Sequence, residues 1–169
     1  MLDDARSFAL AAHGEQKYGD RPYAWHLEAV VDLLAPYGVE AQILGYLHDV
    51  VEDTPVTEHE IRERFGPLVA ECVGLLTDPP GTTRAERKAG TYARLAGVDG
   101  PHELALVAKA ADRLANVRCC VADQRQGLWE TYRREHSAFR QAAWRPGLCD
   151  PLWEELDALL IALPPSNGR

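Results

Sequence analysis

Apolar residues recur at steps of three and four positions along almost the whole chain. Near the start they are Leu2, Ala5, Ala9 and Ala12. This period places the apolar side chains on one face of an α-helix, whereas a strand exposed on one side would alternate with a period of two. No convincing run of such alternation occurs, so the sequence predicts an all-α fold.

Stretches rich in proline and glycine divide the periodic segments and mark turns. Between these stretches we expect helices near 2–13, 26–36, 40–53, 57–65, 67–77, 83–96, 102–120, 124–143 and 150–163. The length of 169 residues suits one domain that buries its own hydrophobic core. We therefore expect a single helical bundle over 1–163 and a frayed C-terminal tail over 164–169.

The formal net charge of -8 argues against a surface dedicated to nucleic acid. A small anion can still bind where basic residues gather locally. No apolar run approaches the roughly 20 residues needed to cross a bilayer, and Asp3, Asp4 and Arg6 interrupt the N-terminus where a signal peptide would be apolar. We expect a cytoplasmic protein with neither a nucleic-acid nor a membrane partner.

The four cysteines include no CxxC pair and no zinc-knuckle spacing with histidine. They are Cys72, Cys119, Cys120 and Cys149. This pattern favours reduced, buried thiols, and the sequence assigns no role to the adjacent pair.

A cluster of carboxylates follows an apolar stretch in the middle of the chain. Asp49, Glu52 and Asp53 are spaced so that one helix would present all three on the same face. Residues 43–47 before them are apolar, so we expect partial burial, where like charges repel most strongly and a cation relieves the repulsion. His48 adds a nitrogen ligand beside this cluster.

Two further residues of metal-ligand type lie in apolar helical contexts, which makes a metal site a better interpretation than a solvated helix end with core histidines. The expected ligands are His26, His48, Asp49 and Asp112. Two imidazoles and two carboxylates without thiolate suit one divalent ion such as Mn²⁺, Fe²⁺ or Mg²⁺ better than structural zinc. Four protein ligands leave about two octahedral positions for water and a phosphoryl oxygen, as in metal-assisted attack at phosphorus.

The order of these ligands resembles that of the HD-domain phosphohydrolases, which carry a histidine, a later His-Asp pair and a distant aspartate. More narrowly, the run GYLHDVVEDTPVTEHEIRERFGPLV is similar to the hydrolase domain of the RelA/SpoT alarmone enzymes and to the stand-alone small alarmone hydrolases. The resemblance extends from Ala5 to about Ala143 and implies an HD-domain fold.

The resemblance also implies roles for residues around the metal. It assigns catalysis to Glu52 and Asp53. It implies substrate contacts from basic, amide and aromatic side chains, namely Lys17, Arg87, Lys88, Lys109, Arg113, Asn116 and Tyr132. The family often has a second basic residue directly after the first, and this chain has Tyr18 there.

The resulting hypothesis is a metal-dependent 3′-pyrophosphohydrolase of the alarmone guanosine-3′,5′-bis(diphosphate), without synthetase activity and with one Mn²⁺ ion. One alternative is an HD nucleotidase or phosphodiesterase for another nucleotide, such as an adenosine alarmone. Another is a nucleotide sensor that binds the metal and turns nothing over. The guanine base, the identity of the metal and a homo-oligomeric state are left open by the sequence.

Overall fold

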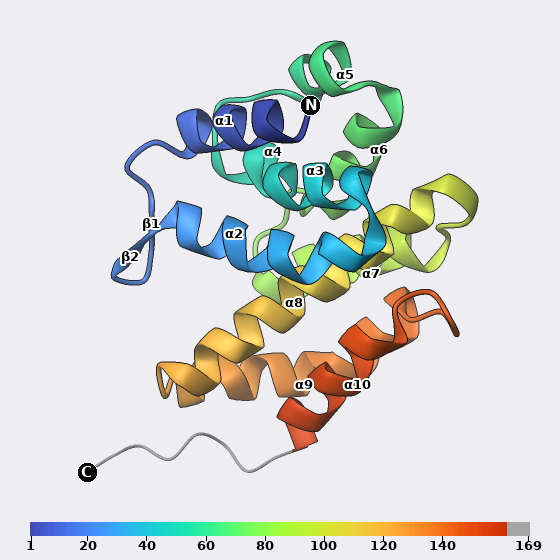
Figure 1. Ribbon diagram of the computed structural model, residues 1–169. Helices are drawn as coiled ribbons and strands as arrows, with labels where there is room; N and C mark the ends of the chain where they lie inside the picture. The colour runs from blue at the N-terminus through green and yellow to red at the C-terminus, as the bar shows by residue number, and fades with distance from the viewer. Residues whose placement is uncertain (162–169) are drawn as a thin grey trace.

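The computed structural model describes residues 1–161, and helices make up most of this part of the chain (Figure 1). The α-helices are α1 Leu2–His13, α2 Tyr23–Leu34, α3 Val39–Leu47, α4 Val50–Asp53, α5 Glu58–Phe65, α6 Pro67–Leu76, α7 Arg84–Ala96, α8 Glu103–Ala122, α9 Gln126–Ala143 and α10 Asp150–Ile161. Short 3₁₀ helices follow α2 (η1, Ala35–Tyr37) and precede α8 (η2, Gly100–His102). The prediction of an all-α fold is confirmed, while the expected tail at 164–169 lies outside the described residues. None of the described helices has the length and apolar character that a membrane span requires.

A two-stranded hairpin, which the sequence analysis did not predict, joins α1 to α2 at the left of Figure 1. Its strands are β1 (Lys17–Tyr18) and β2 (Arg21–Pro22), which pair in antiparallel register. Gly19 in the turn has φ 62°, a left-handed conformation that glycine adopts without steric cost. Strands of two residues are too short for a period-two pattern, so the sequence could not reveal them.

The prediction of one continuous helix at 40–53 is wrong, because a turn at His48 and Asp49 separates α3 from α4. Asp49 has φ −107° and ψ −2°, which lies in the bridge region between helix and strand. His48 Nδ1 lies 2.7 Å from the carbonyl oxygen of Gly45, so a side chain contacts the last turn of α3. The break turns the His48 and Asp49 side chains toward α2 and α8.

Close packing of α2 on α3 depends on Gly45. A Cβ atom at this position would lie 2.7 Å from Leu34 Cδ1, well inside van der Waals contact. The absence of a side chain lets the two helix backbones approach each other. This approach brings His26, on α2, near His48 at the end of α3.

Helix α8 crosses the middle of the molecule, with α2 and α3 on one side and α9 and α10 on the other (Figure 1). Its middle section is buried on nearly all sides and belongs to one hydrophobic core shared with the surrounding helices. Lys109, Asp112 and Arg113 are buried there. Because burying a charged group is costly unless it is paired, these three side chains must have partners. Those partners form the site described next.

Candidate metal centre

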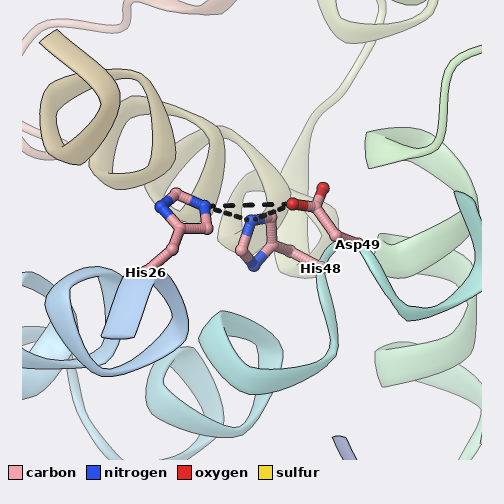
Figure 2. A group of neighbouring side chains, drawn as sticks. All are labelled: His26, His48 and Asp49. Carbon is pink, nitrogen blue, oxygen red and sulfur yellow. Dashed lines mark hydrogen bonds and ion pairs between the residues drawn. The ribbon is translucent and has the colours of Figure 1, made fainter. Parts of the chain in front are cut away.

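Four side chains from three parts of the fold converge at the centre of the molecule. His26 comes from α2, His48 and Asp49 from the turn after α3, and Asp112 from α8. The Nε2 atoms of the two histidines are 3.4 Å apart, and the first three side chains point toward one another in Figure 2. Asp49 Oδ2 lies 2.9 Å from His48 Nε2 and 3.9 Å from His26 Nε2.

Asp112, on α8, completes this group. Its Oδ1 atom lies 3.4 Å from His26 Nε2 and 3.6 Å from His48 Nε2. The structure therefore brings together all four residues that the sequence analysis selects as ligands. With the two histidines almost completely buried, two nitrogens and two carboxylate oxygens face one small space.

The electrostatics of this space favour a cation. Although burial opposes it, the carboxylates of Asp49 and Asp112 raise the pKa of His48 well above its usual value. Because His48 Nδ1 donates its hydrogen to the carbonyl oxygen of Gly45, Nε2 is the ring atom that faces the carboxylates, and a proton or a metal ion would bind there. A donor set of two imidazoles and two carboxylates fits a divalent metal ion, and the same field that attracts a proton attracts such an ion.

Tyr23 links the candidate ligands to the expected catalytic pair. Its hydroxyl lies 2.5 Å from Asp49 Oδ2, to which it donates, and 3.1 Å from Asp53 Oδ2. Burial raises the pKa of Tyr23, so the hydroxyl stays protonated and remains a donor. Asp53 also accepts a hydrogen bond from Gln16 at 3.2 Å. Asp53 is not among the residues that line the cavity beside the candidate ligands, and its hydrogen-bonded link to Asp49 runs through Tyr23.

Glu52 lines the cavity directly. Its Oε2 accepts a hydrogen bond of 2.9 Å from the backbone N–H of Asp78, which fixes the direction of the carboxylate. Burial raises the pKa of Glu52. Glu52 is therefore the better placed of the two expected catalytic residues to exchange a proton with a molecule in the cavity.

The cavity has a volume of 130 Å³ and a predominantly polar lining. Besides the residues already described, four cationic side chains line it, namely Arg84, Lys88, Lys109 and Arg113. Lys88 Nζ lies 2.9 Å from Asp78, and Lys109 Nζ lies 3.3 Å from Asp112. The remaining lining residues are Tyr18, Asn116 and Tyr132. A strongly anionic ligand would meet positive charge on this side of the metal ligands.

Two arginines share one carboxylate at the edge of the cavity. Arg84 contacts Glu135 through Nε at 2.7 Å and NH2 at 3.1 Å, and Arg113 NH1 lies 3.3 Å from the same carboxylate. Both guanidinium groups also lie near the Tyr132 ring. One carboxylate cannot neutralise two guanidinium groups, so positive charge remains. Arg84 is not among the substrate residues expected from the sequence, although its position one turn before Lys88 on the same helix could have indicated it.

Two of the expected substrate residues do not reach the cavity. Lys17 is exposed on β1, and Arg87 NH1 donates to the carbonyl oxygen of Gly81 at 3.2 Å. Neither belongs to the cavity lining. In contrast, Tyr18 and Tyr23 do line it, and the sequence analysis gave neither a role. A larger groove of 760 Å³ lies between α7 and α9, but its lining is mainly apolar and includes none of the four candidate ligands.

The chain is similar to several known proteins. The model of the HD domain family matches residues 5–148. A guanosine-3′,5′-bis(diphosphate) 3′-pyrophosphohydrolase of Aquifex aeolicus is 36% identical over 120 residues, which cover 69% of this chain and 17% of the relative. The chain spans less than a quarter of the length of the first bacterial relatives it matches.

A relative of similar size carries the same enzyme name. It comes from Danio rerio and is 35% identical over 127 residues, which cover 70% of this chain and 68% of the relative. Among solved structures, that of a metazoan ortholog of SpoT, which is described as hydrolysing ppGpp, superimposes with a TM-score of 0.73. That match covers 93% of this chain and 94% of the other at 23% identity, so it supports the fold alone.

Proposed function

The chain belongs to the HD-domain family, and we propose that it is a metal-dependent hydrolase that removes the 3′-diphosphate of guanosine-3′,5′-bis(diphosphate). One observation carries the proposal: two imidazole nitrogens and two carboxylate oxygens converge beside a lining of four cationic side chains. The Danio rerio relative, of which this chain covers 68%, is named for this reaction. The small nucleotide is the partner that follows from both.

The residues that would hold the metal are His26, His48, Asp49 and Asp112. We expect one Mn²⁺ ion, because mixed imidazole and carboxylate donors suit a borderline divalent ion. When bound, such an ion supplies Lewis acidity, which polarises a phosphoryl oxygen and makes water a stronger acid. The candidate ligands lie on separate elements, so the fold rather than a local motif would set their spacing.

Glu52 would accept a proton from the attacking water. Its carboxylate lines the cavity, and the backbone N–H of Asp78 orients it. Burial moves its pKa upward, toward the range in which a carboxylate is an effective general base. Asp53 would act indirectly, because its carboxylate helps to orient the Tyr23 hydroxyl that donates to Asp49.

The small size of the cavity suits a phosphate group but leaves no room for the nucleoside. Pockets that enclose a whole drug-sized ligand usually have volumes of about 300 Å³ or more, whereas this cavity has 130 Å³. A diphosphate group would enter it and meet Lys88, Lys109 and Arg113, while the nucleoside would stay at its edge. Lys17 and Arg87 lie outside the lining, so their contacts would be with parts of the nucleotide that project beyond the cavity.

The proposal is tested with purified protein, Mn²⁺ and a panel of nucleotides separated by chromatography. We expect guanosine-3′,5′-bis(diphosphate) to yield GDP and pyrophosphate, with monophosphates and cyclic dinucleotides left intact. If the corresponding adenosine compound were hydrolysed faster than the guanosine compound, the substrate assignment would change to an adenosine alarmone. Binding without product would indicate a sensor, and rapid loss of a monophosphate or cyclic dinucleotide, with the guanosine compound untouched, would overturn the alarmone assignment.

A further inference from the structure

We propose that Tyr18 is a positioning residue of the metal centre, which holds one candidate ligand by ring stacking and a second through a hydrogen-bonded amide. This inference rests on the proposed function, because it takes His26 and Asp112 as metal ligands. Tyr18 lies on β1 of the hairpin, and its ring lines the cavity.

The stacking contact is with His26. The two ring centroids are 4.6 Å apart, and the ring planes differ by only 9°. The Nδ1 atom of His26 is buried and has no hydrogen-bond partner among the described residues. A metal-binding histidine usually has such a partner, which fixes the direction of its ring, and His48 has one in Gly45. At His26, stacking on the Tyr18 ring fixes the direction of the imidazole instead.

The stack continues beyond Tyr18 and is anchored to α8. The Trp25 ring lies 5.9 Å from the Tyr18 ring at 27°, and the Arg21 guanidinium lies 4.4 Å from the centroid of Trp25. Arg21 in turn donates two hydrogen bonds, of 2.7 and 2.8 Å, to the carboxylate of Asp123. Asp123 directly follows α8, so this chain of contacts ties the hairpin to the helix that carries Asp112.

The hydrogen-bonded contact runs from Tyr18 to the same helix. The Tyr18 hydroxyl donates to Asn116 Oδ1 at 2.5 Å. Asn116 Nδ2 then donates to Asp112 Oδ1 at 2.6 Å and to the Asp112 carbonyl oxygen at 2.9 Å. Oδ1 is the Asp112 oxygen that faces both histidines, so the amide fixes the oxygen that would contact the metal.

A tyrosine can make both contacts at once, whereas a lysine or arginine cannot do so without adding charge. The phenol ring is flat enough to stack on His26, and its neutral hydroxyl satisfies Asn116. The neutral phenol also adds no positive charge beside the metal ligands, whereas a basic side chain would. The chain therefore uses this position to organise the ligands rather than to bind phosphate.

The test uses two substitutions and a matched control. Tyr18→Phe keeps the ring and removes the hydrogen bond to Asn116, while Tyr18→Leu removes both contacts. Tyr37→Phe is the control, because Tyr37 lies in η1 and does not line the cavity. The dissociation constant for Mn²⁺ is measured by titrating metal-free protein, together with Tm and the NMR resonances of the His26 ring.

We expect Tyr37→Phe to bind Mn²⁺ as the unaltered protein does. The Tyr18 substitutions should weaken binding by about 10-fold to 100-fold, the usual effect of removing a group that orients a ligand, with Tyr18→Leu the weaker binder. The His26 resonances should move in Tyr18→Leu, because the ring current of Tyr18 is lost.

Equal Mn²⁺ affinity in all four proteins would overturn the inference. If the unaltered protein bound no divalent metal, the proposed function would fail, and unchanged His26 resonances in Tyr18→Leu would overturn this inference separately.

Discussion

Oδ1 of Asp112 lies 3.4 Å from Nε2 of His26, although α8 and α2 are far apart in the sequence. Both side chains are buried, and Asp112 is also 3.3 Å from Lys109 Nζ. Although burial alone would raise it, Lys109 and the two histidines hold the pKa of Asp112 well below its usual value. Asp112 is thus an anion in the interior, as a metal ligand must be.

The first prediction follows from this contact. Asp112→Ala and His48→Ala should each abolish tight metal binding, because each removes one of four donors and leaves the others misaligned. Elemental analysis of the purified proteins checks this, with about one ion per chain expected before substitution. Asp99→Asn is a suitable control, since Asp99 is exposed and outside the cavity lining. Unchanged metal content in both variants would contradict the ligand assignment.

The second prediction separates proton transfer from metal binding. Glu52→Gln and Asp53→Asn should keep most of the metal and lose turnover by about 10²-fold or more, the usual scale of general acid–base catalysis. Because Glu52 lines the cavity and Asp53 acts through Tyr23, we expect the larger loss at Glu52. Metal content and kcat are measured on the same preparations. If either variant lost the ion outright, that residue would have to be a ligand instead.

The convergence of the four candidate ligands could be predicted from the sequence, because residues of this type are unusual in buried helical segments. An aspartate in the middle of an apolar helix, as Asp112 is in α8, has few roles that do not involve a cation. Periodicity also predicted the positions of most helices. It could not predict the turn at His48 and Asp49, which depends on a side-chain contact with Gly45 and on packing against other helices.

The cationic lining was predicted less well, because spacing on a helix does not fix where a long side chain ends. Arg87 turns back to Gly81, whereas Arg84, one turn earlier, reaches Glu135 across the space between α7 and α9. The contacts of Tyr18 could not be predicted, because its partners, His26 and Asn116, come from other parts of the chain. Contacts of this kind exist only once the helices have packed.

The third prediction concerns the cysteines, all four of which are free and buried among the described residues. Burial raises the pKa of Cys72, Cys120 and Cys149 to about 11. At pH 8 about 0.1% of such thiols would be thiolate, against about a quarter of ordinary ones, and the thiolate is the reactive form. A chromogenic disulfide reagent should therefore react slowly with the native protein and rapidly with four thiols in denaturant. Rapid reaction of the native protein, or fewer than four thiols in denaturant, would contradict this.

The last prediction compares two arginines on α7. Arg84 lines the cavity and Arg87 does not, so only Arg84 is placed to contact a phosphate beside the metal ligands. A hydrogen bond to a charged group contributes about 1.5–3 kcal/mol, so Arg84→Gln should lower kcat/KM by about 10-fold to 100-fold. Part of this loss should appear in kcat, because the substitution also leaves Glu135 less neutralised beside the phosphates.

Arg87→Gln is the matched control, since it makes the same chemical change on the same helix. Any contact of Arg87 would be with a part of the nucleotide outside the cavity, equally strong before and during the reaction. Such a contact changes KM and leaves kcat unchanged. Steady-state kinetics of both variants on guanosine-3′,5′-bis(diphosphate) with Mn²⁺ provide the comparison. A fall in kcat for Arg87→Gln as large as that for Arg84→Gln would mean that the phosphates do not enter the cavity beside Arg84.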